Sequence, residues 1–473
     1  MIPGERQEFD VAVVGAGVVG SAIARKLATE GATVVVLDRA PDVGDGTSKA
    51  NTAIVHTGFD TVPGSLESRL VGRGHDLLAD YATTAGIALE RTGALLVAWD
   101  DEQEQALPGL LAKAEANGYR GASLVDADEV RRREPHLGRR ARSGLLVPGE
   151  WVVDPWSVCL AFATEAVAAG AELRLSTPVT GVDTVEAGHE VRVPRGRVRA
   201  RWLVNAAGLG ADHIDRMLDR ADFTVTPRRG QLLVFDKAAR RLLTHIVLPV
   251  PTERSKGVLV SPTTSGNVLL GPTAEDLEDR TDTATTAPGF DLLLTAARRI
   301  LPALVDEEVT AAYAGLRAAT EHRDYRIRCH DDLRYVTVGG IRSTGLTSSL
   351  AIAEHVGGML AGSGARWAGG PVESTPPVMP PLGESQVRPM GDPVRIATDP
   401  SYGTVLCHCE QVSRGEVRDA CRAVVPATDL GGVRRRTRAM NGRCQGFYCA
   451  AEVVSLVAGE TGIGPAVLTR TLT

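Results

Sequence analysis

The chain opens with a short apolar run, a glycine turn and a longer segment in which small and apolar residues recur with a helical period. The first run, Val11 to Val14, is apolar at every position, and a second such run follows in TVVVLD before Arg39. Runs that are apolar throughout are typical of strands buried on both faces of a parallel sheet. The order predicts a βαβ unit at the N-terminus.

The middle of the chain continues to alternate strand-like and helix-like patterns. Apolar runs predict strands in GALLVAW near Gly93, at 202–205 and in GQLLVF after Arg229, and CLAFATEAVAAGAEL from Cys159 predicts a helix. Strand, glycine turn and helix return at 334–360. We therefore expect an α/β fold with a discontinuous Rossmann-like domain and an inserted α+β substrate domain.

The pattern breaks down at 369–400, where eight prolines and little periodicity predict an extended linker or a wrapping arm. The expected main domain is 8–368, with its nucleotide-binding part at about 8–90, 150–215 and 325–365. A compact C-terminal unit is expected at 401–473. A unit of that size often needs a metal or a cluster to supplement a small core.

Composition narrows the range of partners. The formal net charge is -6 and 43% of the residues are hydrophobic, so no global basic field favours nucleic acid or anionic lipid. No apolar run reaches the roughly 18 residues of a membrane-spanning helix. We expect a cytoplasmic protein without a membrane span of its own, which reaches the inner face of a membrane, if at all, through a partner chain.

The first glycine turn carries a dinucleotide-binding pattern. Gly15-Ala16-Gly17-Val18-Val19-Gly20 follows a strand and opens a helix, the context in which GxGxxG is informative. Glycines there allow a tight turn, close approach of a pyrophosphate and close helix packing, and the helix N-terminus favours phosphate. Asp38, at the end of the second strand, is placed to accept ribose hydroxyls. Ala24, Gly31 and two further glycine-bearing strand ends, at 205–212 and 339–342, favour FAD over NAD.

With these motifs the sequence resembles the D-amino-acid-oxidase-like superfamily of FAD-dependent oxidoreductases over about residues 8 to 365. TSKAN at 47–51, IVHTGF at 54–59, PRRGQ at 227–231, GLR at 315–317 and GIRSTGLT at 340–347 look like active-site segments of its glycerol-3-phosphate dehydrogenases and L-2-hydroxyglutarate oxidases. Motif and resemblance together give these expected FAD-binding residues: Gly15, Ala16, Gly17, Val18, Val19, Gly20, Asp38, Arg39, Thr47, Ser48, Asn51, Ala207, Gly208, Gly340, Gly345, Leu346 and Thr347.

Removal of hydride from a carbon that bears a hydroxyl requires a base for the hydroxyl proton. His56 is the leading candidate, because imidazole titrates near neutral pH and the resemblance places its loop beside the flavin; His245 and His322 are alternatives. An anionic substrate calls for a guanidinium fork, for which Arg317 is the first candidate, followed by Arg229 and Arg342.

Cysteines cluster in the C-terminal unit. Cys407 and Cys409 form a Cys-x-Cys pair, and Cys444 and Cys449 form a Cys-x4-Cys pair. Four thiolates at these spacings suit a [2Fe–2S] cluster; zinc or unliganded thiols are the alternatives. The segment resembles the bacterioferritin-associated-ferredoxin type of iron–sulfur domain, in the form fused to anaerobic glycerol-3-phosphate dehydrogenases. Cys159, Cys329 and Cys421 are expected to be structural.

A basic run precedes the second cysteine pair, at Arg434, Arg435, Arg436, Arg438 and Arg443. It is open to three interpretations: compensation of an anionic cluster, a docking face for an acidic electron acceptor, or a solvated helix face.

A flavin accepts two electrons as hydride and a [2Fe–2S] centre moves one at a time, so their fusion favours a dehydrogenase. The resemblance implies oxidation of sn-glycerol 3-phosphate to dihydroxyacetone phosphate. An L-2-hydroxyacid dehydrogenase or an amino-acid or opine dehydrogenase subunit is the alternative, and a binding module with a vestigial flavin domain is a remote one. A quinone or a carrier protein, and further subunits, are the expected partners.

Overall fold

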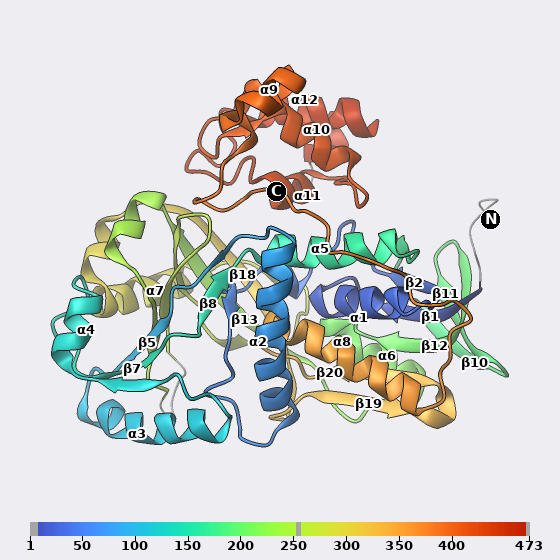
Figure 1. The fold of residues 1–473 in the computed structure, drawn as a ribbon, viewed down its shortest axis with the longest axis horizontal. Coiled ribbons are helices and arrows are strands. Elements are labelled where there is room, and N and C mark those ends of the chain that lie inside the picture. Colours follow the sequence, from blue (N-terminus) through green and yellow to red (C-terminus); the bar gives the residue numbers. More distant parts are fainter. Residues whose placement is uncertain (1–7, 252–256, 470–473) are drawn as a thin grey trace.

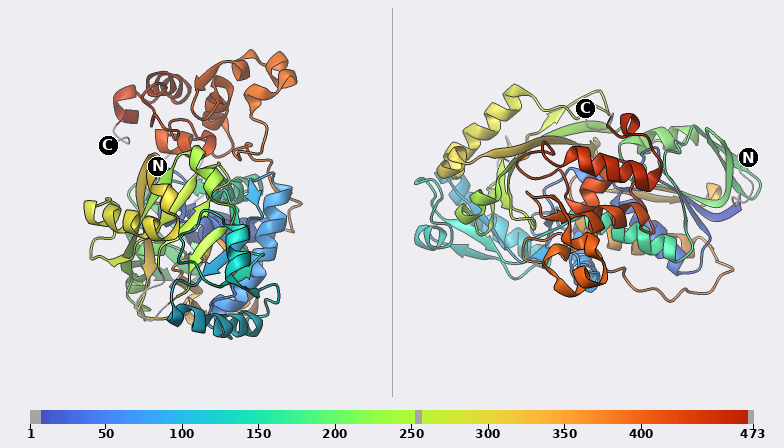
Figure 2. Two further views of the ribbon diagram at one scale, coloured as in Figure 1. Left: turned by 90° about the vertical axis from the view of Figure 1, so that its left-hand side faces the viewer. Right: turned by 90° about the horizontal axis from the view of Figure 1, so that it is seen from above.

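The structure is a computed structural model that describes residues 8–251 and 257–469. Two lobes lie side by side, and a small C-terminal domain lies across the top of both (Figures 1 and 2). Within the described ranges no helix combines the length and the apolar character needed to cross a membrane. The last four residues of the expected C-terminal unit lie outside the described part.

The nucleotide-binding lobe is built on an eight-stranded sheet of mixed direction. β1 is buried at every position after Glu8, because helices cover both of its faces. The parallel strands are β1 (Glu8–Val14), β2 (Val34–Leu37), β9 (Glu172–Arg174), β12 (Gly196–Asn205) and β20 (Tyr335–Gly339). The antiparallel strands are β10 (Gly181–Val185), β11 (Gly188–Val193) and β19 (Arg326–His330). The helices are α1 (Val18–Thr29), α2 (Leu66–Thr84), α5 (Pro155–Ala168), α6 (Ala211–Met217) and α8 (Gly345–Gly362).

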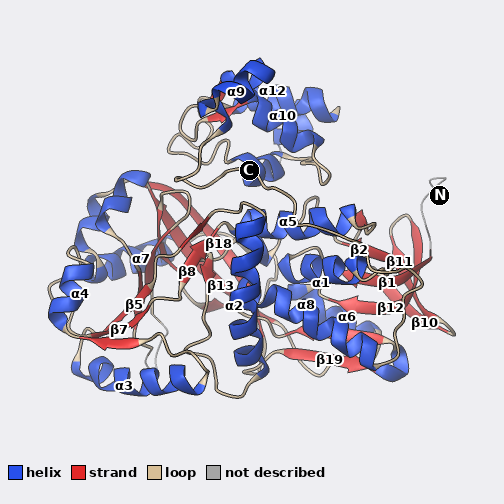
Figure 3. Ribbon diagram, in the orientation of Figure 1, coloured by secondary structure: helices blue, strands red, loops and turns tan. Residues whose placement is uncertain are grey.

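The second lobe is a nine-stranded sheet with helices on its outer side (Figure 3). Its strands are β5 (Ala94–Val97), β6 (Ser123–Val125), β7 (Gly144–Val147), β13 (Thr226–Phe235), β14 (Ile246–Pro249), β15 (Leu259–Pro262), β16 (Val268–Gly271), β17 (Glu275–Asp276) and β18 (Val309–Ala319). Its helices are α3 (Asp101–Ala116), α4 (Ala127–Arg133) and α7 (Ala287–Ile300). A small sheet of β3 (Ile54–Val55), β8 (Trp151–Val153) and β4 (Leu89–Glu90) lies where the chain passes between the lobes.

The C-terminal domain has a core of its own, formed around Val412, Val433 and Val453. It consists of β21 (Val405–Cys407), β22 (Val412–Ser413), α10 (Arg414–Arg422), α11 (Leu430–Thr437), α12 (Ala450–Thr461) and α13 (Pro465–Leu468). The α/β class, with a Rossmann-like domain, an inserted substrate domain and a small C-terminal domain, is confirmed.

The proline-rich segment wraps around the molecule. Its backbone N–H groups bond to both lobes: Val372 to the Thr29 carbonyl, Met379 to the Ala85 carbonyl, and Glu384 to the Thr264 carbonyl, at 2.8 to 2.9 Å. Of the two interpretations of the sequence, an extended linker and a wrapping arm, the contacts support the wrapping arm. Its end is already helical, in η6 (Pro389–Gly391) and α9 (Pro393–Thr398), a feature that the aperiodic sequence did not predict.

The packing of α2 on α8 leads to a prediction with an internal control. A Cβ atom at Gly74 would lie 2.4 Å from the Thr347 carbonyl oxygen, whereas one at Gly72 would meet nothing within 4 Å. We expect Gly74→Ala to lower the free energy of unfolding by about 1–3 kcal/mol through overpacking. Gly72→Ala in the same helix should raise it by up to about 1 kcal/mol. Thermal unfolding of the two variants checks this, and equal effects would contradict the packing described.

Candidate active site

The expected cofactor-binding residues gather at one edge of the nucleotide-binding sheet. The glycine turn follows β1, Asp38 follows β2, Ala207 and Gly208 follow β12, and Gly340 follows β20. These four strands are parallel neighbours, so their carboxyl ends meet at the same edge. Ligands of such sheets bind outside the carboxyl ends of the strands.

The glycine turn permits contacts that no side chain would allow. Gly15 has a φ of +107°, and a Cβ atom there would lie 2.4 Å from the Ala206 carbonyl oxygen. A Cβ atom at Gly20 would lie 2.0 Å from the Gly15 carbonyl oxygen. The missing side chain at Gly15 lets the turn pack against the end of β12, and the missing side chain at Gly20 lets α1 pack against the turn. Both leave bare backbone where a pyrophosphate approaches in this class of site.

The two long helices that begin at this edge, α1 and α8, are both uncapped. Neither has a side-chain hydrogen bond from its N-cap residue or an acidic residue in its first turn. By contrast α2, α3, α4, α5 and α7 are each capped by a Ser, Thr or Asp side chain. Both helices therefore begin without a cap of their own, although Ser48 Oγ accepts from the Val18 N–H and Glu67 accepts from the Thr344 hydroxyl at the start of α8. Their positive ends suit a bound anion.

Asp38 and Ser48 are hydrogen-bonded to the glycine turn and to the start of α1, and Asn51 is bonded to Ser48. The Asp38 carboxylate accepts from the Ala16 N–H at 2.5 Å and from the Ala40 N–H at 2.8 Å, and burial raises its pKa. Ser48 Oγ accepts from the Val18 N–H at 3.0 Å, and Asn51 donates to the Ser48 carbonyl at 2.7 Å. Arg39 is exposed.

The segment that carries Thr47 to Asn51 is pressed against β18 of the other lobe. Thr47 Oγ1 donates to the Leu316 carbonyl at 2.8 Å, and the Tyr313 hydroxyl donates to the Asn51 carbonyl at 3.1 Å. A Cβ atom at Gly315 would lie 2.4 Å from the Ala50 carbonyl oxygen. The two lobes therefore meet at this segment, and the chain runs on from it to His56.

His56 is held by a buried carboxylate. Its Nδ1 lies 2.9 Å from Glu150 Oε2, and its backbone N–H donates to Thr347 Oγ1 at 3.0 Å. Glu150 is fully buried, and its other oxygen accepts from the N–H and the hydroxyl of Thr57 at 2.6 and 2.9 Å. Glu150 is not predicted from the sequence, because 94 residues separate it from His56. The arrangement of a histidine oriented by a carboxylate suits proton transfer.

Arg317 presents a half-buried cation with no carboxylate to balance it. In residues 8–251 and 257–469, no carboxylate oxygen lies within 4.0 Å of its guanidinium. Burial and the neighbouring charge of Arg228 lower its pKa. Arg228, directly opposite on β13, pairs instead with Asp276. A desolvated guanidinium without a partner is a natural anion site.

Arg229 does not fit its predicted role. Its side chain is on the opposite face of β13 from Arg228 and is buried in ion pairs with Glu275 at 2.6 Å and Asp282 at 2.9 Å. These contacts hold β17 and the following loop, so we correct the prediction and assign Arg229 a structural role.

Arg342 and the two alternative histidines, His245 and His322, are each hydrogen-bonded to other parts of the chain. Arg342 lies between β20 and α8 and donates to the Arg323 carbonyl at 2.5 Å. His245 bonds through Nδ1 to the buried Glu134 at 2.8 Å, and His322 donates through Nε2 to the Asp222 carbonyl at 3.2 Å. Neither histidine is on the segment that contacts β18.

The four candidate cluster ligands form two contacting pairs, Cys407 with Cys449 and Cys409 with Cys444. Backbone N–H groups of Tyr448, Gly446 and Phe447 bond to the Cys444 sulfur and hold the pKa of that thiol below its ordinary value. Burial raises the pKa of Cys449 to about 12. In the described ranges no three metal-ligating side chains surround a single point. Two thiol pairs with N–H donors fit a [2Fe–2S] cluster, in which each iron takes two protein ligands.

Cys421, Cys159 and Cys329 stand apart from these pairs. Cys421 packs against the C-terminal core, and Cys159 is buried under the glycine turn, with its thiol 3.7 Å from the Ala16 carbonyl oxygen. Cys329 contacts Asp331 and Ser363.

Most side chains of the basic run are engaged within the chain, so the interpretation as a solvated helix face does not fit. Arg435 and Arg436 pair with Asp42 of the nucleotide-binding lobe, Arg438 pairs with Glu410, and Arg443 pairs with Asp236. Arg434 bonds to Asn441. The run is used within the chain, chiefly to join domains.

Comparisons with known proteins identify the family of the chain. A family model described as FAD dependent oxidoreductase matches residues 10–359, and one described as BFD-like [2Fe-2S] binding domain matches residues 405–458. The chain belongs to the family of FAD-dependent oxidoreductases. Its predicted membership of that family, and the presence of a C-terminal BFD-like domain, are confirmed.

Three relatives are informative. A glycerol 3-phosphate dehydrogenase of Caloramator mitchellensis is 32% identical over 96% of this chain and 95% of its own length. The dithionite-reduced, FAD-bound L-alpha-glycerophosphate oxidase of Mycoplasma pneumoniae superposes with a TM-score of 0.73 at 27% identity, covering 78% of this chain and 98% of that one. A mitochondrial L-2-hydroxyglutarate dehydrogenase of Arabidopsis thaliana is 28% identical over 74% of this chain and 83% of its own length.

The residues present fit FAD. The bare glycine turn, the N-termini of α1 and α8 and the polar segment at 47–51 supply the backbone donors and polar side chains that a dinucleotide cofactor needs. The chain is an FAD-dependent oxidoreductase similar to glycerol-3-phosphate dehydrogenases.

Proposed function

We propose that the protein is a dehydrogenase that oxidises sn-glycerol 3-phosphate to dihydroxyacetone phosphate and exports the electrons one at a time. The observation that carries the proposal is the half-buried, carboxylate-free guanidinium of Arg317 on the strand that packs against the segment leading to His56. The relative from Caloramator supports the phosphate as substrate, because its similarity spans nearly the whole chain.

In this proposal each side chain has one task. FAD, when bound, accepts the hydride from the carbon that bears the hydroxyl. His56 takes the hydroxyl proton on its ring, and Glu150 orients the ring and stabilises its charged form. Arg317 binds the substrate anion, with Arg342 as a second candidate. Gly15 to Gly20, Asp38, Thr47, Ser48, Asn51 and the first turn of α8 hold the cofactor.

We further propose that Cys407, Cys409, Cys444 and Cys449 hold a [2Fe–2S] cluster, which supplies one-electron transfer to an acceptor. The two thiol pairs and the N–H donors around Cys444 support this ligand set.

The experiment that tests the substrate is anaerobic bleaching of the flavin absorbance. We expect bleaching on addition of sn-glycerol 3-phosphate and little on addition of L-2-hydroxyglutarate. Bleaching by the hydroxy acid alone would replace the proposed substrate with a 2-hydroxyacid, the alternative that the Arabidopsis relative favours. If neither compound bleaches the flavin, amino acids and opines become the substrates to test.

Arg317→Met should leave FAD bound and raise the substrate concentration for half-maximal bleaching by about 100-fold, because two charge-assisted hydrogen bonds are lost. Arg228→Met is the matched control: it lies directly opposite on β13 but is already paired with Asp276. Titration of both variants with substrate checks this. Equal effects of the two substitutions would remove Arg317 from the anion site.

His56→Asn should leave FAD bound and lower the bleaching rate by about 100-fold or more, through loss of the base. Glu150→Gln should lower it by about tenfold or more and shift the acid limb of the rate–pH profile to lower pH. That shift is expected because removal of the negative charge disfavours the protonated ring.

The control for this pair is His245→Asn, because His245 makes a similar bond to a buried glutamate away from the segment at 47–57. Its bleaching rate should equal that of the unmodified protein. An unchanged rate in His56→Asn, or an unmoved pH profile in Glu150→Gln, would contradict the assigned roles.

Cys407→Ser and Cys444→Ser should each abolish iron and acid-labile sulfide, expected at about two of each per chain in anaerobically prepared protein. Cys421→Ser should keep both. Analysis of metal and sulfide checks this, and zinc without sulfide would contradict the cluster.

A further inference from the structure

The C-terminal domain is fastened to the nucleotide-binding lobe by a buried set of charges. The Arg436 guanidinium forms two bonds to the Asp42 carboxylate, both of 2.7 Å, and the two side chains are only 3% and 2% exposed. Arg435 reaches the same carboxylate at 2.6 Å and Asp45 at 2.8 Å. Burial alone would raise the pKa of Asp42, but the bonds and charges of Arg436 and Arg435 bring it below the ordinary value.

Asp42 and Asp45 belong to the loop that is hydrogen-bonded to the glycine turn. The Gly44 N–H donates to the Ala16 carbonyl at 2.9 Å, and Ser48 Oγ accepts from the Val18 N–H at the start of α1. The loop is therefore bonded directly to the glycine turn. Left unpaired, two carboxylates in this loop would repel the phosphates of FAD. Arg435 and Arg436 neutralise them.

The same region is closed by apolar packing. Val425, between α10 and α11, is buried in the core of the nucleotide-binding lobe, and α11 contacts α5. Arg435, Arg436, Ser48 and Trp156 line one small cavity between α11, the loop and α5. The C-terminal domain thus covers the outer side of the loop that lies over the start of α1.

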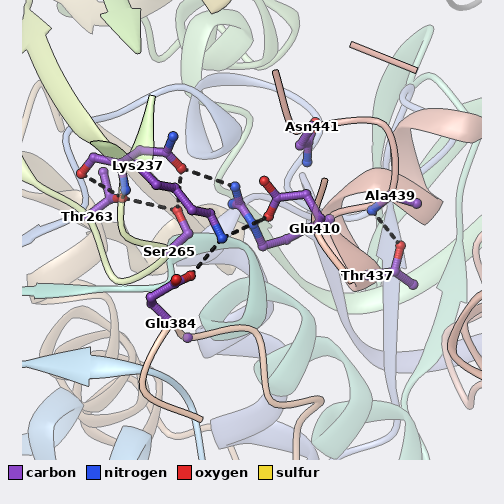
Figure 4. Close-up of polar contacts among 12 residues, drawn as sticks. Lys237, Thr263, Ser265, Glu384, Glu410, Thr437, Ala439 and Asn441 are labelled. Atoms are coloured by element: carbon purple, nitrogen blue, oxygen red, sulfur yellow. Dashed lines mark hydrogen bonds and ion pairs between the residues drawn. The ribbon is translucent and has the colours of Figure 1, made fainter. Parts of the chain in front are cut away.

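A second set of contacts fixes the C-terminal domain on the second lobe (Figure 4). Lys237 lies between Glu384 of the wrapping arm, at 2.6 Å, and Glu410, at 3.7 Å. Arg438 pairs with Glu410 at 2.8 Å and donates to Asn267 at 3.4 Å. Two anchors on two lobes leave the domain little freedom to rotate away from the loop.

We propose that Arg435 and Arg436 are positioning residues for FAD: through Asp42 and Asp45 they fix the phosphate-binding loop, so that retention of FAD depends on the docked C-terminal domain. The proposal rests on FAD binding and is independent of which substrate is oxidised. In it, the domain that carries the cysteines also locks the cofactor of the neighbouring lobe in place.

The test is the rate of FAD release from the full-length holoprotein, followed by the rise of free-flavin fluorescence on dilution, with iron content as the check on the C-terminal domain. Asp42→Asn and Arg436→Gln should each release FAD about tenfold faster or more, because each breaks the buried ion pair that fixes the loop beside the glycine turn. In Asp42→Asn we expect this loss of position to outweigh any attraction between the freed guanidinium groups and the phosphates. The double variant should release FAD no faster than the quicker single variant, because one contact is lost in all three.

Arg422→Gln is the matched control, because its ion pair with Glu460 is exposed and lies within the C-terminal domain. Its FAD release and iron content should not change. Loss of iron in Arg436→Gln would mean that the C-terminal domain itself is disturbed. Asp42→Asn then becomes the decisive variant, because Asp42 lies outside the C-terminal domain. Unchanged FAD release in Asp42→Asn with full iron content, or additive effects in the double variant, would overturn the proposal.

Discussion

The close contact of Gly315 with the Ala50 carbonyl is the constraint on which the site depends. A side chain at position 315 would push β18 away from the segment at 47–57. That segment reaches the start of α1 through Ser48, β18 through Thr47, and the start of α8 through the His56 N–H. The cofactor edge, the candidate base and the strand that carries Arg317 therefore meet where the two lobes approach to backbone distance at Gly315.

Placement of charge explains how the site stays available to a ligand. Most arginines around it are neutralised by carboxylates of the chain, as Arg228 and Arg229 show. Arg317 is the exception on these two strands. Desolvation of a cation costs free energy unless an anion compensates, so the protein holds Arg317 in a state that a bound anion would improve. The same reasoning applies in reverse at Asp42, where an acid that would oppose FAD phosphates is neutralised in advance.

The C-terminal domain is joined to the rest of the chain by both polar and apolar contacts. Val425 enters the core of the nucleotide-binding lobe, while the ion pairs of Arg436 with Asp42 and of Lys237 with Glu410 set the orientation. Such pairs add specificity of docking more than net stability, because desolvation offsets much of their attraction. A domain held in one orientation suits electron transfer between two cofactors of one chain.

The local features of this molecule could be predicted from the sequence and the long-range ones could not. The glycine turn, the strand ends and the two cysteine pairs have signatures within a few residues, because backbone geometry and ligand spacing are local properties. Glu150 has no such signature: it is an acid in a turn between two strands, and only the fold brings it to His56. Arg229 and the basic run were misjudged for the same reason, since Glu275, Asp282 and Asp42 are distant in sequence.

The central claim is that substrate electrons enter at the flavin and leave through the cysteine-bound cluster of the same chain. The most direct measurement is rapid freeze-quench electron paramagnetic resonance of the anaerobic protein after one addition of sn-glycerol 3-phosphate, with flavin absorbance followed in parallel. We predict that the flavin bleaches first and that the signal of a reduced [2Fe–2S] cluster then grows within the time of one turnover. A bleached flavin beside a full complement of iron that stays oxidised over that time would contradict the account.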